Sequence, residues 1–197
     1  PADKEFLTAW LKPMAQVAKD FLHPDGKIAH FSDGSLDLPI DIDGLLPQLS
    51  GILGSAPAQQ RVFDLNDTGY VGARFFDKDL FLYDYGQPVE TSLPAHGHSD
   101  IFSFEWSIGG QRVIIDQGVF EYSPTPRRDL SRSSLSHNTV SLDNHSQCEM
   151  YGSFRVGRRA KVKLLKKQID DGRVRMSAEH NGFAHLPGAP VHIRELD

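Results

Sequence analysis

Three short segments carry histidine and aspartate side chains at spacings that suit metal binding or proton transfer. The first, HGHSD, begins at His96. In an extended segment residues two apart share a face, so we expect His96, His98 and Asp100 to point the same way. The second segment is an apolar run that ends at Asp116, and the third opens a predicted strand at His137. Two histidines and one aspartate at strand ends form a common zinc shell, with a fourth position left for water or substrate.

Each of these residues also has a structural explanation. A single histidine near a sheet is more often a hydrogen-bonded packing residue than a ligand, and short motifs of this kind often mislead. Asp116 also suits the cap of a turn at Gln117-Gly118. The combination of three such segments favours the metal hypothesis over three separate coincidences.

The first part of the chain is expected to be helical. Apolar residues recur every three or four positions from 3 to 22, which predicts a helix, and Pro13 is expected to kink or split it. A second helix is predicted over 41–53, with Asp41 or Asp43 as its cap and Gly54 as its end. We therefore predict a helical domain over residues 1–58.

From residue 59 the pattern becomes that of strands. Turn residues are expected at Asp77-Lys78-Asp79, Gly109-Gly110, Asp143-Asn144 and Asp171-Gly172. Many short strands separated by such turns predict a mainly β protein with an antiparallel β-sandwich over 59–197. The predicted strands are 61–65, 70–77, 79–85, 100–109, 111–116, 138–143, 160–169 and 173–180.

Within this region two further expectations concern side chains. The stretch 123–136 shows no periodicity and is expected to be a long loop, a kind of segment that often carries function. In strand 100–109, Phe102, Phe104 and Trp106 are expected to form a core face, with Glu105 exposed on the other.

Composition narrows the classes of partner. The 197 residues carry a formal net charge of −5, and the chain shows only short basic stretches, so we expect no nucleic-acid partner. No apolar run is long enough to span a membrane, so no membrane partner is expected. Cys148 is the single cysteine, which excludes an intrachain disulfide.

Three strings, in this order, resemble the heparinase II/III family of polysaccharide lyases. They are HGHSDIFSFEWSIGGQRVIIDQGVFEY from His96, RRDLSRSSLSHNTVSLD from Arg127 and YGSFRVGRRAKV from Tyr151. The resemblance covers about residues 70 to 160. Each string is weak alone, but their order and spacing together are specific to the family.

The resemblance implies a fold and an activity. Members join an N-terminal (α/α) toroid to antiparallel sandwich layers, so residues 1–58 would be the end of the toroid and 59–197 a truncated sandwich. They cleave uronate-containing polysaccharides, such as heparin, heparan sulfate or alginate, by β-elimination. In this family the counterparts of His98, Asp116 and His137 bind one zinc ion, regarded as structural, and the counterpart of His96 faces the substrate and takes part in catalysis.

Other residues are candidates with a competing structural explanation. Tyr122 follows the turn after Asp116 and is expected either to reach the cleft as a catalytic residue or to pack in the sandwich. Arg128 and Arg132 suit the carboxylate or sulfate groups of an acidic polysaccharide, because a guanidinium binds such groups through two parallel hydrogen bonds; the alternative is a solvated loop. Asn138 is expected to orient the neighbouring ligand.

Three other functions compete with a lyase. HGHSD overlaps the motif of metallo-β-lactamase-type hydrolases, but these add a histidine where this chain has Ile101. A non-haem iron oxygenase would use Asp100 in place of Asp116. The third is a non-catalytic carbohydrate-binding or structural sandwich.

Because the principal catalytic tyrosine and the carboxylate-neutralising residue of the family come from the toroid, we expect this polypeptide alone to be inactive. Both ends read as interrupted structure, and the apolar surface expected there favours a homo-oligomer. The parent protein is expected to be periplasmic or secreted.

Overall fold

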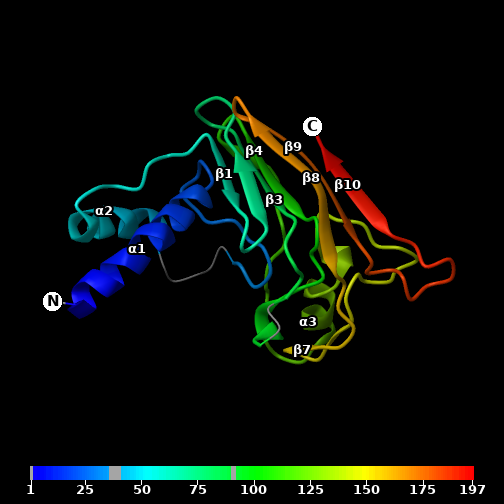
Figure 1. The fold of residues 1–197 in the computed structure, drawn as a ribbon. Coiled ribbons are helices and arrows are strands. Elements are labelled where there is room, and N and C mark those ends of the chain that lie inside the picture. The colour runs from blue at the N-terminus through cyan, green and yellow to red at the C-terminus, as the bar shows by residue number, and fades with distance from the viewer. Residues whose placement is uncertain (1, 36–40, 90–91) are drawn as a thin grey trace.

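The computed structural model describes residues 2–35, 41–89 and 92–197 (Figure 1). The predicted class is confirmed, since the fold is mainly antiparallel sheet with few helices. In chain order its elements are α1 (Ala2–Asp20), α2 (Ile42–Leu53), β1 (Val62–Leu65), β2 (Tyr70–Ala73), β3 (Leu80–Asp84), η1 (Pro94–His96), β4 (Phe104–Ile108), β5 (Gln111–Ile114), α3 (Pro126–Ser131), η2 (Ser134–Ser136), β6 (Met150–Tyr151), β7 (Arg155–Val156), β8 (Val162–Asp170), β9 (Arg173–His180) and β10 (His192–Leu196).

The two long helices pack against each other beside the sheets. The α1 helix runs as one element through Pro13, so of the two expected outcomes, a kink or a split, the split was wrong. Asp41 caps α2 by accepting a hydrogen bond from the Gly44 amide at 3.0 Å, and Gly54 ends it with a φ of 76°. The contact between the helices is built from apolar side chains: Ala15, Leu22 and Leu46 are buried, and Ala18, Ile42, Leu49 and Leu53 pack around them.

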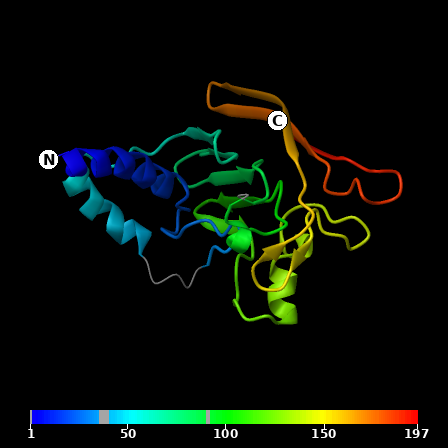
Figure 2. The ribbon, with the colours of Figure 1, turned by 60° about the horizontal axis from the view of Figure 1, so that its bottom comes forward.

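Two sheets form an open sandwich. The larger has five antiparallel strands in the order β1-β2-β3-β4-β5, and the second has three in the order β10-β9-β8. Figures 1 and 2 show the three-stranded sheet, orange to red, on the side of the five-stranded sheet away from α1 and α2. Lys167 of β8 joins the sheets through Asp64 of β1, with Nζ 2.6 Å from the carboxylate. The buried core between them is built from Val71, Tyr83, Tyr85, Ile101, Phe102, Cys148, Ala160, Met176 and Ala178.

The opposite face of the five-stranded sheet is also covered, by the segment that follows α1. Ala29 and Phe31 pack there on Phe63 and Leu80. This cover corrects the expectation for Glu105, whose side chain is fully buried rather than exposed. Sequence alternation gives the period of a strand but does not say which of its faces other segments cover.

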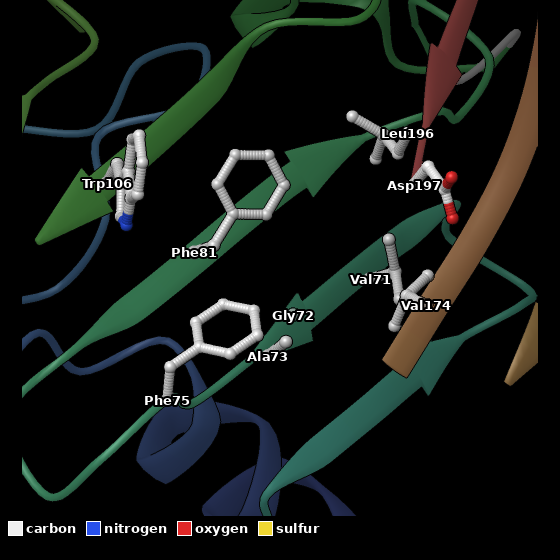
Figure 3. A pocket seen from close by; sticks show the side chains of 9 residues that line it. All are labelled: Val71, Gly72, Ala73, Phe75, Phe81, Trp106, Val174, Leu196 and Asp197. Carbon is white, nitrogen blue, oxygen red and sulfur yellow. The ribbon is translucent and has the colours of Figure 1, made fainter. Parts of the chain in front are cut away.

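The inner face of the five-stranded sheet is only partly covered by the second sheet. Phe81 packs against Phe104 and Trp106, with ring centroids 5.6 and 6.3 Å apart. Trp106 is 37% exposed, because it lies at the open edge, where a small apolar groove of about 260 Å³ runs between the sheets (Figure 3). The predicted core face therefore continues into a groove at its end.

Several predicted elements differ from the structure. Two strands are shorter than expected, since predicted strand 70–77 ends at Ala73 and predicted strand 100–109 begins at Phe104. Residues 138–143 form no regular strand and make only an isolated bridge between Leu142 and His145. In this stretch, side-chain hydrogen bonds take the place of the backbone hydrogen bonds of a strand. Thr139 Oγ1, for example, donates to the Ile101 carbonyl at 2.6 Å. The stretch 123–136, expected to be a loop, contains α3 and η2, and Thr125 caps α3 through the amide of Arg128.

Among the described residues, no helix combines the length and the apolar character needed to cross a membrane.

Candidate functional site

The three predicted metal residues lie together in one buried cluster. His98 follows η1, Asp116 follows β5 and His137 follows η2. His137 Nδ1 is 2.8 and 2.9 Å from the two carboxylate oxygens of Asp116, and the rings of His98 and His137 are 5.2 Å apart. All three side chains are buried. The fold thus brings together residues from three separate segments of the chain.

Among the residues that the structure describes, two imidazole nitrogens of this cluster find no hydrogen-bond partner. His137 uses Nδ1 for Asp116, and His98 uses Nε2 for Asp33, at 2.8 Å in each case. The other two nitrogens, His98 Nδ1 and His137 Nε2, are buried and unpaired. A buried polar atom without a partner is rare and calls for an explanation such as a bound ion. This donor chemistry, two imidazoles beside a carboxylate, fits zinc.

The cluster is not a finished coordination shell. Within residues 2–35, 41–89 and 92–197, no group of three or more His, Cys, Asp or Glu side chains is arranged as the ligands of one metal ion. Zinc at His98, Asp116 and His137 therefore stays a prediction.

Contacts on every side hold the Asp116 carboxylate. It accepts hydrogen bonds from the Ser103 hydroxyl at 2.7 Å and the Gly118 amide at 3.0 Å. Burial alone would raise the pKa of Asp116, but the hydrogen bond and charge of His137 outweigh it, and the pKa is lowered. The same pairing raises the pKa of His137 against its own burial. The two side chains therefore favour each other's charged form.

Asn138 acts on the backbone around these residues. Its Nδ2 donates to the carbonyls of Phe104 at 2.9 Å and Ile115 at 2.8 Å. Ile115 directly precedes Asp116, so Asn138 ties the strand end that carries this carboxylate to the segment that carries His137. Asn138 thus fixes the main chain beside the cluster, and its expected role in orienting a metal ligand stays a prediction.

His96 occupies a different environment from His98. It ends η1, and its side chain is 62% exposed. Its Nδ1 bonds one carboxylate oxygen of Asp33 at 2.8 Å, while His98 Nε2 bonds the other at the same distance. Although η1 interrupts the expected extended conformation, the two histidines still face one common group.

Tyr122 lies beside His96 at the surface. Their ring centroids are 6.1 Å apart, and Phe154 stacks on Tyr122 at 5.9 Å. Tyr122 is 47% exposed, so it is a rim residue rather than part of the sandwich core. Burial and the nearby Asp33 raise the pKa of Tyr122, partly offset by Arg128, which keeps the phenol protonated at neutral pH. The two candidate catalytic side chains therefore share one exposed patch.

Asp33 is the central residue that the sequence did not reveal. It lies 63 and 65 positions from the two histidines that it bonds, in the segment between the two predicted helices. Burial would raise the pKa of its carboxyl, but hydrogen bonds from His98, Arg128 and His96 outweigh burial and lower it. Its position in Asp33-Gly34-Ser35, a turn-like string, gave no signal beyond turn chemistry.

The two candidate substrate-binding arginines are fully buried. Arg128 is held by Asp33 and by the Ser153 carbonyl at 3.0 and 3.1 Å. Arg132 donates to the carbonyls of Gly97, Gly152 and Arg155, at 3.0 Å for the last two. In this arrangement neither guanidinium faces solvent, so we revise their expected role from binding a polymer to fixing the loops of the site.

The hydrogen bonds of the Asp100 carboxylate lead to Ser32, in another segment of the chain. Its carboxylate accepts from the amide and hydroxyl of Ser32 at 3.0 and 2.9 Å. Asp116, not Asp100, makes the direct contact with His137. This geometry disfavours the oxygenase alternative, in which Asp100 would replace Asp116.

Comparison with known proteins supports one family. The family described as heparinase II/III-like, C-terminal, matches residues 57–197. A heparan sulfate lyase from Pedobacter heparinus is similar in structure, with a TM-score of 0.67 and 18% identity over 89% of this chain and 28% of that chain. A heparinase III structure gives a TM-score of 0.69 and 17% identity over 90% of this chain and 28% of that chain.

These structural matches show the fold alone at such identities, and this chain spans only about 28% of their length. The sequence matches no curated protein. The predicted boundary between a helical and a sandwich domain is not tested by these matches. Because the family match extends over residues 57–197, well over half of the sequence, the chain belongs to the heparinase II/III-like C-terminal family.

Proposed function

We propose that this chain is part of a polysaccharide lyase that cleaves uronate-containing polysaccharides of the heparin and heparan sulfate type by β-elimination. The observation that carries the proposal is the exposed His96, fixed by Asp33 and placed next to Tyr122 at the edge of the buried His98–Asp116–His137 cluster. Family membership and the likeness to heparinase III structures support it.

The reaction needs three functions at the sugar. The C5–H bond of the uronate breaks as the C4–C5 double bond forms, the C4–O4 bond breaks, and O4 takes up a proton. A base must accept the C5 proton, and an acid must give a proton to O4. A hydrogen-bond donor or cation must neutralise the C5 carboxylate. The chain's own exposed groups suit the first two functions.

His96 and Tyr122 divide these functions according to their contacts. His96 donates a hydrogen bond from Nδ1–H to the Asp33 carboxylate, so that Nε2 carries the lone pair that can accept the C5 proton. Tyr122 carries its proton at neutral pH, which suits donation to O4. Since Arg128 and Arg132 are buried, the group that neutralises the C5 carboxylate is proposed to come from another part of the parent protein.

One zinc ion bound by His98, Asp116 and His137 would supply rigidity by joining the three segments that form this wall of the site. The role that we propose for it is structural, because His96 and Tyr122 lie outside the ligand set.

The test is an assay of the full-length protein on heparin, heparan sulfate and alginate. Elimination creates an unsaturated uronate, which absorbs in the ultraviolet, whereas a hydrolase would release reducing ends without that absorbance. We expect absorbance with at least one polymer and a large loss of it in His96→Ala. Binding of acidic oligosaccharides without either product would support the non-catalytic carbohydrate-binding alternative and contradict the proposal.

A further inference from the structure

The segment of residues 30–34 crosses the site and is bonded to it along its length. The His30 amide donates to Glu105 at 2.7 Å, and the Ser32 amide donates to Asp100 at 3.0 Å. The Gly34 carbonyl accepts from the Val119 amide at 2.9 Å. These three bonds connect the segment to β4, to Asp100 and to the chain beyond β5. The backbone on both sides of Asp33 is therefore fixed.

Asp33 uses this fixed position to bind three basic side chains at once. One carboxylate oxygen accepts from His98 Nε2 at 2.8 Å and from Arg128 Nη1 at 2.5 Å. The other accepts from His96 Nδ1 at 2.8 Å and from Arg128 Nη2 at 3.2 Å. The side chain is only 7% exposed. The bidentate arginine therefore orients the carboxylate, and the carboxylate orients both histidines.

We propose that Asp33 is the positioning residue of this site, setting both the orientation and the tautomer of His96. This inference rests on the proposed role of His96 in the lyase reaction. Asp33 does not touch the reacting sugar in this proposal, and its effect on the reaction is exerted through His96.

The physical reason is the exposure of His96. A side chain that is 62% exposed has few packing contacts to select one rotamer. A hydrogen bond to a buried, immobile carboxylate selects the rotamer and keeps the proton on Nδ1, so that Nε2 presents its lone pair outward. Without Asp33 the ring would sample other orientations and the Nε2–H tautomer, and the acceptor would face the sugar only part of the time.

The same carboxylate sets the tautomer of His98. Because Nε2–H of His98 donates to Asp33, the lone pair is on Nδ1, the unpaired nitrogen inside the cluster. Asp33 thus connects the exposed histidine to the buried pair. It also gives the buried Arg128 a function, which is to hold Asp33 in place.

The first arm of the test measures kcat and KM for the full-length protein and its Asp33→Asn variant. An asparagine amide cannot accept from both histidines, so we expect kcat to fall about 100-fold, as for a misplaced catalytic group, with KM changed less than about threefold. In a His96→Ala background the same substitution should lower kcat by less than about threefold further, because its effect is exerted through His96. Asp33→Glu, which keeps the carboxylate, should restore part of kcat.

The matched control is Asp25→Asn, in the same connecting segment. Asp25 is paired with Arg112 at 2.9 Å but touches neither histidine, so kcat should stay near the wild-type value. A loss of kcat in Asp33→Asn that recurs in full in the His96→Ala background would overturn the positioning role and indicate a general structural one.

The second arm is independent of activity. Proton–nitrogen correlation spectra of protein with labelled histidine rings, at about pH 8.5 where reference histidine is neutral, report the tautomer of His96. We expect the Nδ1–H form in the wild type and the Nε2–H form or a mixture in Asp33→Asn. Equal spectra would overturn the inference. A wild-type protein inactive on every polymer would count against the proposed function, and the spectra would still decide the role of Asp33.

Discussion

Glu105 Oε2 lies 2.7 Å from His23 Nε2, and neither side chain is exposed to solvent. His23 Nδ1 is in turn 2.6 Å from the Ser107 hydroxyl, and Arg112 approaches the same carboxylate at 3.4 Å. This pair joins the segment that follows α1 to β4. A buried carboxylate–imidazole contact therefore connects the helical segment to the sheet.

Replacing Glu105 with Ala is expected to destabilise the protein by about 3–5 kcal/mol, because it leaves the buried partners without their acceptor. The free energy of unfolding in urea measures this. Glu179→Gln removes a pair with Lys163, whose side chain is 70% exposed, and should cost less than about 1 kcal/mol. If both variants lost the same free energy of unfolding, the buried pair would stabilise the protein no more than the exposed pair does.

A glycine in the chain beyond β5 keeps segment 30–34 in place. Gly118 has a φ of 58°, and an added Cβ would lie 1.9 Å from the Gly34 carbonyl oxygen. Gly118→Ala should therefore displace the segment that carries Asp33, lowering stability by about 3 kcal/mol or more and reducing lyase activity.

Gly152 is the matched control for this prediction. It has a similar φ of 56°, but an added Cβ would meet nothing within 4 Å. Gly152→Ala should lower the free energy of unfolding by only about 1 kcal/mol, the cost of a left-handed backbone conformation in alanine. If both variants unfold at the same urea concentration, the close approach to Gly34 has no energetic role.

The paired histidines of β9 and β10 predict acid sensitivity. His180 Nε2 and His192 Nδ1 lie 2.9 Å apart. Burial lowers the pKa of His180 to about 3, helped by His192 and Arg194, and lowers that of His192 to about 4, helped by Arg194. Both values lie below the unfolded-state pKa of about 6.5. In the pH range between the folded and unfolded pKa values, the unfolded chain therefore binds more protons than the folded protein. Stability contributed by neutral histidines is complete above about pH 6.5 and declines as the pH falls toward 4.

The measurement is the free energy of unfolding in urea from about pH 7 to pH 4.5. We expect a steep decline in the wild type, of up to about 1.4 kcal/mol per pH unit for each histidine, and a shallower one in His192→Gln. His145→Gln, which removes an exposed histidine outside the pair, controls for the loss of an imidazole as such. An unchanged slope in His192→Gln would exclude the pair as the cause.

Zinc content tests the buried cluster directly. We expect about one zinc ion per chain by elemental analysis of purified protein, falling to background in His98→Ala and His137→Ala but not in His145→Ala. A chelator should lower the thermal midpoint, because a metal bound only by the folded state adds about 4 kcal/mol at a thousandfold excess over Kd. Iron in place of zinc would favour an oxygenase, and no metal in the wild type would contradict the proposed zinc site.

Local chemistry was readable from the sequence. The turns at Gly109-Gly110, Asp143-Asn144 and Asp171-Gly172 have positive φ at both residues, as their residue types predict. The cap of α2 at Asp41 was predictable for the same reason, since a cap depends on a few neighbouring atoms. The histidines and Asp116 were identified from residue types, spacing and family resemblance.

Tertiary packing decided the rest. The sequence could not reveal Asp33, because it meets His96, His98 and Arg128 only after the chain folds segment 30–34 back onto the five-stranded sheet. It could not assign Arg128 or Arg132, since burial depends on which segments cover a loop. Turns and caps are set by interactions over a few residues, whereas burial and hydrogen-bond partners are set by contacts between segments that are far apart in the chain.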